Sequence, residues 1–588
     1  MKTILKYVKP YSFRMLIGFL IKVSGTFMDL GLPWVLAYII DEVIPTESIK
    51  LILLWGFIMI LLSIGARQMN IIANRMASRV AGDSVKALRH DLYQKIEGLS
   101  GKQVDTFSIP SLVSRMTSDT YNVHQMIGMT QRLGVRAPII IIGGIIITMT
   151  LEPVLTLVLI AILPLLAIVV YLVSKNGIPI YMQGQTAVDK MIRTVRENIS
   201  GIRVIKALSK TEYEQKRFSE DTERIVEKEL KAGSIMAIIN PAMNLLLNIG
   251  LTLVVVVGAY RVNSGASEVG KIVAFLSYFT LILNAMLMLT RIFVIISKAS
   301  SSSIRIAEVL NAPKDLLVMD NQIYPDSKNK GTYFIEFDNV TFSYNKNEDE
   351  IVDVKETKNH VTDISFNIKK GEKLGIIGST GSGKSTIINL IMRYYDINSG
   401  AIYIEGKDIR TYKLEELRSK FGVVFQNDSI FKGTILSNID LSRDIREDEI
   451  MSSTIDAQAH EFIAQTVSGL NHGVATGGTN LSGGQKQRVL LSRALANNPE
   501  ILILDDSSSA LDYKTDANLR KAINENHNNS TIIMVAQRIS SIMHMEHILV
   551  LEDGETIGYG SHEELIRNCD IYKEIYESQM GEENYEGQ

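Results

Sequence analysis

Apolar residues gather into long stretches over the first 310 positions of this 588-residue chain. Six of these stretches reach the length of about 20 residues that an α-helix needs to cross the hydrocarbon core of a bilayer. They lie near 15–40, 50–73, 127–150, 154–174, 235–260 and 271–297. The pattern predicts an all-α polytopic membrane domain with six transmembrane helices over residues 1–312, and argues against buried helices of a large soluble protein.

Charge sorts the connections between these stretches. The long segments 75–126 and 175–234 are rich in Lys and Arg, whereas 41–47 and 149–153 carry acidic residues and no basic ones. Basic loops are retained on the cytoplasmic side, so this pattern places the N-terminus, both long loops and the C-terminal half in the cytoplasm. The short connection 261–271, with a base at each end, is a mild exception.

Both basic loops also show the apolar spacing of helices. The segment 175–234 continues as helix on either side of Gly201, where a helix could end or bend. We therefore expect membrane helices that project deep into the cytosol, each pair tipped by a short helix that makes a mechanical contact.

Polar residues within the predicted spans are costly in a bilayer and therefore informative. They are Asp29 in the first span, Asn240, Asn244 and Asn248 in the fifth, and Ser277, Asn284 and Arg291 in the sixth. The asparagines either join neighbouring helices by hydrogen bonds or line a water-filled substrate cavity, and both interpretations stay open. For Asp29 and Arg291 a cavity is the favoured interpretation.

The composition changes to that of a soluble α/β domain after Pro313. We expect a linker over 313–330, a nucleotide-binding domain over 331–580 and a tail over 581–588. The domain opens with two predicted strands, 333–337 and 340–344. A charged run with no apolar periodicity, 345–360, is interpreted as a solvated hairpin insertion.

A glycine-rich loop stands between an apolar strand pattern, 373–377, and a helical pattern, 386–391. Its residues are Gly378, Ser379, Thr380, Gly381, Ser382, Gly383, Lys384 and Ser385, followed by Thr386. Strand, loop and helix in this order form a P-loop, in which backbone N–H groups surround phosphate oxygens at a helix N-terminus. Lys384 is expected to reach the terminal phosphates and Ser385 to hold Mg²⁺.

Further motifs follow the P-loop. One strand pattern ends at Gln426, and the buried strand 501–505 ends at Asp505, where P-loop enzymes hold Mg²⁺. Another strand, 531–537, ends at Gln537, and a segment with a terminal carboxylate runs from 508 to Asp512. Leu481 begins a signature that opens a helix and forms a second phosphate cradle, and its other residues are Ser482, Gly483, Gly484 and Gln485.

Composition excludes several other classes of protein. The net charge of −3 offers no case for nucleic acid as a partner, and 46% hydrophobic residues is high for a soluble enzyme. The single cysteine, Cys569, rules out an internal disulfide and a Cys-rich metal site.

Six spans followed by a P-loop domain with the Leu-Ser-Gly-Gly-Gln signature resemble one half of an ATP-binding cassette (ABC) exporter, over residues 1–580. The resemblance implies a dimer in which ATP and Mg²⁺ lie between the P-loop of one chain and the signature of the other. It also implies that Tyr344 stacks on adenine and that Gln426 senses Mg²⁺ and the γ-phosphate. The loops near 107–120 and 195–211 would hold the coupling helices.

Three positions depart from the family pattern. Asp506 replaces the usual glutamate after the strand-end Asp, Gln537 replaces the usual histidine, and Thr476 replaces an acidic residue before the signature. Aspartate is one methylene shorter than glutamate, and a misplacement of about 1 Å can cost about 100-fold in rate. We therefore expect this P-loop, with Lys384, to bind ATP well and hydrolyse it poorly.

Because the signature is intact, the sequence resembles the degenerate-site subunits of bacterial heterodimeric multidrug exporters of the plasma membrane. A different half-transporter would then carry the catalytic glutamate and histidine, and the cargo would be a hydrophobic small molecule, lipid or peptide. Two alternatives remain at this point. One is a homodimeric lipid or peptide exporter that uses Asp506 as base, and the other is a nucleotide-binding membrane regulator without transport.

Overall fold

The computed structural model describes residues 2–320, 324, 326–329, 331–344, 359–507 and 510–583. The expected hairpin insertion, 345–360, lies outside the described residues except for its last two positions, and so do Ser508 and Ser509. The chain forms two compact units. The first comprises Met1–Glu97 and Pro110–Ala312, and the second comprises Gly98–Ile109 and Pro313–Gln588.

The first unit is all-α, and within its described residues six helical stretches are long and apolar enough to span a membrane. This confirms the six predicted spans. The long helices are α2 (Ser12–Tyr38), α3 (Ile49–Glu97), α6 (Thr120–Leu151), α7 (Pro153–Ser200), α9 (Thr211–Ala237), α10 (Ile239–Asn263) and α11 (Val269–Leu310). The short ones are α1 (Lys2–Val8), α5 (Ile109–Ser114), α8 (Ile202–Ala207), η1 (Lys9–Tyr11), η2 (Ile39–Val43), η3 (Ile44–Thr46) and η4 (Arg115–Asp119).

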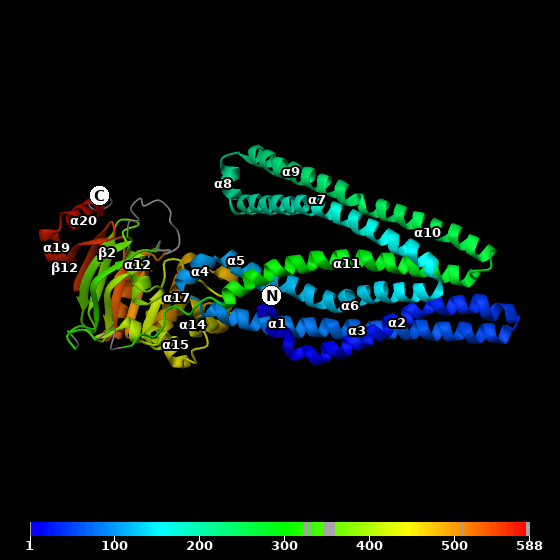
Figure 1. The fold of residues 1–588 in the computed structure, drawn as a ribbon. Helices are drawn as coiled ribbons and strands as arrows, with labels where there is room; N and C mark the ends of the chain where they lie inside the picture. Colours follow the sequence, from blue (N-terminus) through cyan, green and yellow to red (C-terminus); the bar gives the residue numbers. More distant parts are fainter. Residues whose placement is uncertain are drawn as a thin grey trace. The chain divides into compact units, whose positions relative to one another are not determined.

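Helices α2, α3, α6 and α11 pack together as a bundle (Figure 1). Its core includes fully buried aromatic rings of α11, among them Phe275, Tyr278 and Phe279. The Tyr278 hydroxyl donates to the Leu30 carbonyl at 2.5 Å, so even the polar end of this ring is satisfied. Large apolar side chains on the outside, such as Leu53 and Leu157, remain exposed, as expected for a surface that faces lipid.

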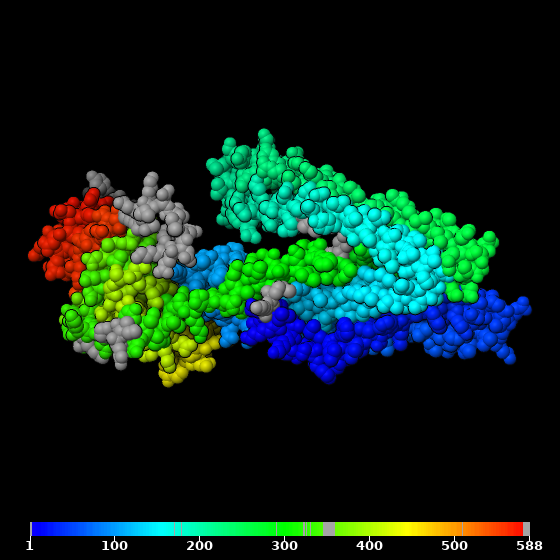
Figure 2. Space-filling model, in the orientation of Figure 1, coloured from blue at the N-terminus to red at the C-terminus, as the bar shows by residue number. Residues whose placement is uncertain are grey.

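Helices α7, α8, α9 and α10 form an arm of the first unit. Figure 1 shows α9 running along α7 with α8 at the tip, and in Figure 2 the arm, cyan to green, separates from the rest of the unit towards α8. Lys190 and Thr194 of α7 both donate to the buried carboxylate of Asp221 on α9, each at 2.9 Å. The structure confirms that 175–234 continues as helix, with Gly201 at the end of α7.

The mild exception to the charge rule has a local explanation. Arg261, at the end of α10, pairs with Glu152 at 3.1 Å, and the Glu152 side chain is only 4% exposed. Glu152 belongs to the neighbouring connection before α7, so Arg261, the base at one end of 261–271, is neutralised where it lies.

The second unit is built on two sheets. The larger has the order β12-β11-β3-β10-β9-β6, in which β11, β3, β10, β9 and β6 run parallel, and the smaller has the order β2-β1-β4-β5. The strands are β1 (Ile335–Phe342), β2 (Val361–Ile368), β3 (Lys373–Gly378), β4 (Ser399–Ile404), β5 (Lys407–Asp408), β6 (Phe421–Val424), β7 (Gly433–Thr434), β8 (Gly473–Val474), β9 (Ile501–Asp505), β10 (Thr531–Val535), β11 (His547–Glu552) and β12 (Glu555–Gly560).

Helices of the second unit surround these sheets. They are α4 (Gly101–Phe107), α12 (Lys384–Ile391), α13 (Leu414–Ser419), α14 (Ile435–Asp440), α15 (Glu447–Asp456), α16 (His460–Ala464), α17 (Gly483–Leu495), α18 (Tyr513–Asn526), α19 (His562–Asn568) and α20 (Asp570–Glu583). Short turns are η5 (Ile409–Thr411), η6 (Gly469–Asn471), η7 (Thr476–Gly478) and η8 (Ile539–Ser541).

One local prediction differs from the structure. The two strands expected at 333–337 and 340–344 are one strand, β1, whose pairing register shifts after Phe337 because Asn339 adopts a left-handed φ of 48°.

The segment 107–120, expected to hold a coupling helix, contains the short helix α5 and the turn η4, and another short helix, α4, comes just before it. Ser100 starts α4, since Ser100 and Gln103 form a reciprocal capping box.

One prediction concerns packing of the arm. A Cβ at Gly250 of α10 would lie 2.2 Å from Phe279 and 2.6 Å from Ile162. We expect Gly250→Leu to destabilise the protein by about 1–3 kcal/mol through overpacking, seen as a lower thermal unfolding midpoint in detergent. Gly56→Leu is the matched control, because a Cβ at Gly56 meets nothing within 4 Å. Equal losses in the two variants would contradict the packing shown here.

Candidate nucleotide site

The glycine-rich loop joins β3 to α12, as the sequence pattern predicts. Gly383 adopts φ 96°, and a Cβ there would lie 2.8 Å from Val361, so only glycine fits without strain. Lys384 donates to the carbonyls of Gly378 and Ser379 at 2.9 and 2.7 Å, which holds the loop closed on itself. The Ser382 hydroxyl is buried without a hydrogen-bond partner in the described structure. The loop therefore fits a phosphate in its curvature and its available donors.

The parallel pairing of β6, β9, β10 and β3 brings their carboxyl ends to one edge of the large sheet. Gly378 ends β3, Asp505 ends β9, and Gln537 lies two residues beyond β10. Gln426 lies two residues beyond β6 and is exposed. Candidates separated by more than 150 residues in the sequence are thus gathered along one edge.

Ser385 and Asp505 form the candidate metal pair. The Ser385 hydroxyl donates to Asp505 at 3.2 Å, and Asp505 is buried. Burial raises the pKa of Asp505, and the nearby Asp506 adds to this against the hydrogen bond from Ser385. Burial likewise lowers the pKa of Lys384, while Asp505 and Asp506 oppose it. A hydroxyl and a carboxylate side by side match the oxygen ligands that Mg²⁺ prefers.

Asp506 and Gln537, two of the three positions singled out as departures, contact each other. The Gln537 side-chain amide donates to the Asp506 carboxylate at 3.0 Å. The backbone of Asp506 has a left-handed φ of 51° and donates to the Val535 carbonyl at 3.1 Å. The carboxylate is therefore held towards β10 by a neutral amide, which donates hydrogen bonds but takes up no proton and carries no charge.

The signature residues cap α17. Ser482 and Gln485 form a reciprocal capping box, with Ser482 N–H donating to the Gln485 side chain at 2.9 Å. Ser482 and Gly483 are exposed at this helix N-terminus, and Gly484 is half-buried. The end of the helix is therefore open to an anion from outside the unit.

The remaining candidates have different local roles. Asp512 caps α18 by accepting from the Thr515 N–H at 2.9 Å and from its hydroxyl at 2.7 Å, and these bonds lower the pKa of Asp512. The Tyr344 hydroxyl contacts Thr386 at 3.5 Å and accepts from Asn389 at 3.2 Å. Tyr344 therefore lies against the first turns of the P-loop helix.

Two parts of the chain match known families. Residues 15–286 match the family described as the ABC transporter transmembrane region, and residues 361–509 match the one described as ABC transporter. The chain is also 35% identical over 593 residues to the ABC transporter ATP-binding protein YfiB of Bacillus subtilis, with 100% of both chains covered. The chain belongs to the ABC transporter family.

Other comparisons agree. The transporter is 32% identical to the ABC transporter ATP-binding protein Rv1273c of Mycobacterium tuberculosis, covering 98% of this chain and 97% of that one. It is 29% identical to YgaD of Bacillus subtilis, named as a multidrug export ATP-binding/permease protein, with 98% of each chain covered. The structure of a bacterial Atm1-family ABC exporter with ATP bound shares its fold, with a TM-score of 0.81 at 22% identity over 97% of this chain and 98% of that one.

These matches establish an ATP-hydrolysing ABC transporter that crosses the membrane several times and carries its ABC domain in the cytoplasm. Within the second unit, α4 contacts the ABC domain. The Tyr395 hydroxyl donates to Asp105 at 2.6 Å, and the Gly101 N–H donates to the Tyr394 carbonyl at 3.3 Å. The Tyr395 ring is also 4.9 Å from that of Tyr344, edge to face.

The polar residues of the spans divide into two groups. The Asp29 carboxylate is paired with Arg136 at 2.9 Å. The other candidates lie largely on open faces of α10 and α11. Asn240, Asn244, Asn248, Asn284 and Arg291 are exposed, and Ser277 is half-buried. Asn248 and Asn284 each donate to a carbonyl one turn earlier on their own helix.

Sequence reasoning missed Gln579, on the C-terminal helix α20. Its side chain accepts from the Ile539 N–H at 2.8 Å and donates to the Gln537 carbonyl at 2.9 Å. One side chain thus holds the backbone on both sides of the turn that positions Gln537. No motif marks this residue, because the contact joins two segments about 40 residues apart.

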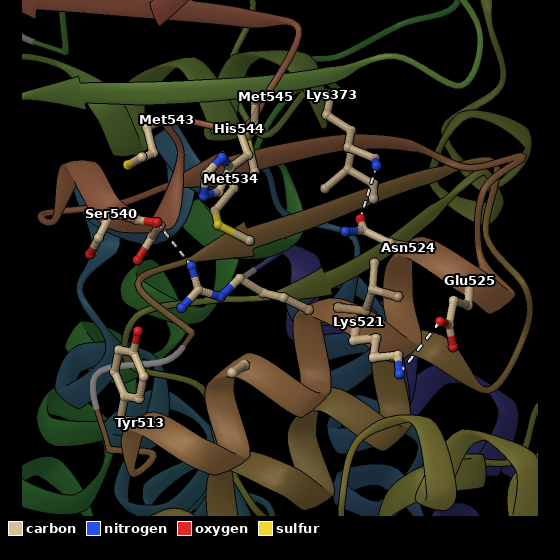
Figure 3. Close-up of a pocket in the computed structure, with 15 residues that line it drawn as sticks. Lys373, Tyr513, Lys521, Asn524, Glu525, Met534, Ser540, Met543, His544 and Met545 are labelled. Carbon is tan, nitrogen blue, oxygen red and sulfur yellow. Dashed lines mark hydrogen bonds and ion pairs between the residues drawn. The ribbon is translucent and has the colours of Figure 1, made fainter.

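The structure also contains a cavity of about 660 Å³ between α18, β10 and the segment 540–545 (Figure 3). Lys373, which begins β3, lines it, so this cavity lies towards the opposite end of β3 from the P-loop. Several of its polar groups pair within the wall. Lys373 donates to Asn524 at 2.9 Å and Lys521 pairs with Glu525 at 3.9 Å. It is therefore no part of the candidate nucleotide site.

The Gln579 contact predicts a change in local opening. Gln579→Ala removes the acceptor of the Ile539 N–H, and a hydrogen bond worth about 1 kcal/mol corresponds to about fivefold faster exchange of that amide. Hydrogen–deuterium exchange of the peptide containing Ile539 would measure this. Gln579→Glu, which keeps the acceptor, should leave the exchange slow. Unchanged exchange in the alanine variant would contradict the contact.

Proposed function

We propose that this transporter chain is one half of a heterodimeric exporter of hydrophobic or amphipathic compounds, with a nucleotide site that binds ATP but hydrolyses it slowly. The single observation that carries the proposal is the Gln537–Asp506 hydrogen bond at 3.0 Å, at the edge where hydrolysis requires a base and a switch residue. The signature of the same chain is free to complete a competent site on a different subunit. A relative named for multidrug export supports the direction and class of transport.

In this proposal the P-loop backbone, Ser382 and Lys384 hold the phosphates, and Ser385 and Asp505 hold Mg²⁺ together with Gln426. Tyr344 contacts adenine, and Asp512 shapes the segment that joins the two sites. Mg²⁺ supplies neutralisation of phosphate charge when bound. Asp506 is short, and its carboxylate is already engaged by a neutral amide, so it is poorly suited to orient and deprotonate an attacking water.

A second chain is supported by the surface of the arm. The α8 region exposes apolar side chains, with Ile202, Val204 and Leu208 at 44%, 61% and 64% exposure. This end of the arm lies beyond the predicted spans, so the surface faces water unless another chain covers it. Helix α4 contacts the ABC domain of this same chain. Asp105 of α4 accepts a hydrogen bond from Tyr395, and the Tyr395 ring packs on Tyr344. Closure of the ABC domains on nucleotide would then move the spans through these helices.

The first test is ATPase activity of this chain alone and co-expressed with its candidate partner. We expect almost no ATPase activity from this chain alone and strong activity from the two chains together. Asp506→Asn in this chain should change the joint activity little, whereas Glu→Gln at the strand end of the partner should abolish it. Robust activity alone that Asp506→Asn removes would instead mean a homodimer with an aspartate base. ATP binding without transport in sealed vesicles would favour a regulator.

A restored site should regain hydrolysis. We expect Asp506→Glu combined with Gln537→His to raise ATP turnover at this chain's own P-loop by at least about tenfold. The measurement is ATPase activity in a complex whose partner carries the Glu→Gln change, so that only this site can turn over. Gln537→His alone is the control and should raise ATP turnover only slightly. No gain in the double variant would contradict the assignment of these two residues.

The lowered pKa of Lys384 predicts a pH dependence of ATP binding. Bound phosphate favours the ammonium form, so affinity is full below the pKa of the free site and falls as the pH rises through it. Titration with a fluorescent ATP analogue at neutral and alkaline pH would measure this. Lys384→Arg keeps its charge and should flatten the dependence. ATP affinity that does not change with pH in the unaltered protein would contradict this role of Lys384.

A further inference from the structure

A line of polar residues runs between α2, α3 and α6 inside the membrane domain. We call it the polar seam. Its members are Lys22, Asp29, Asn70, Asn74, Ser78, Arg132 and Arg136. On α3 and α6 they recur every four residues, which keeps them on one face of each helix. Only Asp29 was singled out from the sequence.

The polar seam holds three cations and one carboxylate. Arg136 pairs with Asp29 at 2.9 Å, and Lys22, 3% exposed, donates to the neutral Asn74 side chain at 3.1 Å. Arg132 donates to the neutral Ser78 hydroxyl. Lys22 lies within electrostatic range of Asp29, Arg132 and Arg136. Two positive charges are therefore in excess.

The arginines also have unused hydrogen-bonding capacity. Among the described residues, the Nε atoms of Arg132 and Arg136 are buried and have no partner. The Asp29 oxygen that meets Arg136 also accepts from Asn70 at 3.3 Å, so the only carboxylate of the seam is already shared. Buried guanidinium groups are usually paired with carboxylate or phosphate, because burying an uncompensated charge is costly.

A purely structural role would call for a balanced set of charges. Helix-joining ion pairs in a membrane bring equal numbers of opposite charges together, since any excess adds desolvation cost without attraction. The excess positive charge of the polar seam lies within two of the predicted spans. It is not sealed, since the side chains of Arg136 and Asp29 are 30% and 23% exposed. An anion could complete the set.

We propose that the polar seam binds the anionic head group, phosphate or carboxylate, of a membrane amphiphile. This inference rests on the proposed transport function, whose substrate class it narrows. Arg132 and Arg136 supply planar donors, Lys22 adds charge, and Asn70 and Asn74 add polar contacts. The apolar tail would lie along the neighbouring apolar surface of the spans. Asp29 tempers the excess charge and positions Arg136.

The test uses three amphiphiles with one dodecyl chain and different heads, namely dodecyl phosphate, dodecyl maltoside and dodecyltrimethylammonium. Equilibrium binding is measured to the full transporter in phosphatidylcholine nanodiscs. We expect dodecyl phosphate to bind most tightly. Arg136→Gln should weaken it about tenfold, the effect of one charge-assisted hydrogen bond, and Arg136→Lys should restore much of the affinity if the glutamine variant folds poorly.

Asp29→Asn separates the proposal from a structural role. It raises the excess charge, so dodecyl phosphate should bind several-fold more tightly, opposite to the effect of Arg136→Gln. If the pair were only structural, both substitutions would disturb binding in the same direction. Arg75→Gln, on an exposed position of α3, is the matched control and should have no effect. Binding that ignores head-group charge, or equal effects of the two substitutions, would overturn the proposal.

Two sources of the anion are distinguished by adding ATP to the assembled transporter. Release of bound dodecyl phosphate together with stimulated ATP hydrolysis would identify a transported amphiphile. Retention, with competition from phosphatidylglycerol, would identify a resident lipid head group, and the anion site would stand in both cases. If no amphiphile stimulates hydrolysis while binding still depends on head charge, the transport proposal fails and the seam remains an anion site.

Discussion

Parallel pairing of β3 with β10 and of β10 with β9 is the interaction on which the cytoplasmic half depends. Parallel strands end at the same edge, so this pairing brings the P-loop, Asp505 and Gln537 together although the intervening sequence differs greatly in length. The strands are buried on both faces and are almost wholly apolar. The polar residues at their ends therefore stand at the border between a rigid core and the nucleotide.

The site is connected to its surroundings by few, well-defined contacts. Gln579 holds the turn after β10, Gln487 of α17 accepts from the Ala510 N–H at 3.1 Å, and Asp105 of α4 accepts from Tyr395. Each contact joins a separate helix to a residue next to a nucleotide motif. A shift at the edge of the sheet can therefore reach the C-terminal helix, the signature helix and α4 through hydrogen bonds of ordinary length.

Several buried charges in the membrane half are paired, but those of the polar seam are not balanced. Arg261 is neutralised by Glu152, and Asp221 is neutralised by Lys190, so these charges are accounted for within the chain. The polar seam differs from both because its cations outnumber its carboxylate. In a low-dielectric environment such an imbalance is costly to maintain, and a binding function gives a physical reason for it.

The sequence alone determined the six spans from long apolar stretches, the orientation from loop charge, and the family from the spans together with the P-loop and the signature that begins at Leu481. Each of these is a local pattern with its own physical cause. The strand ends at Asp505 and near Gln537 were also predicted from the sequence. Only the tertiary structure decided that Gln537 bonds Asp506 and that Gln579 holds the turn beside it. It also decided that Lys22, Arg132 and Arg136 lie in one seam, in which Arg136 alone pairs with a carboxylate. These contacts join helices and strands distant in sequence, and side-chain pairing across them depends on packing that no local periodicity encodes.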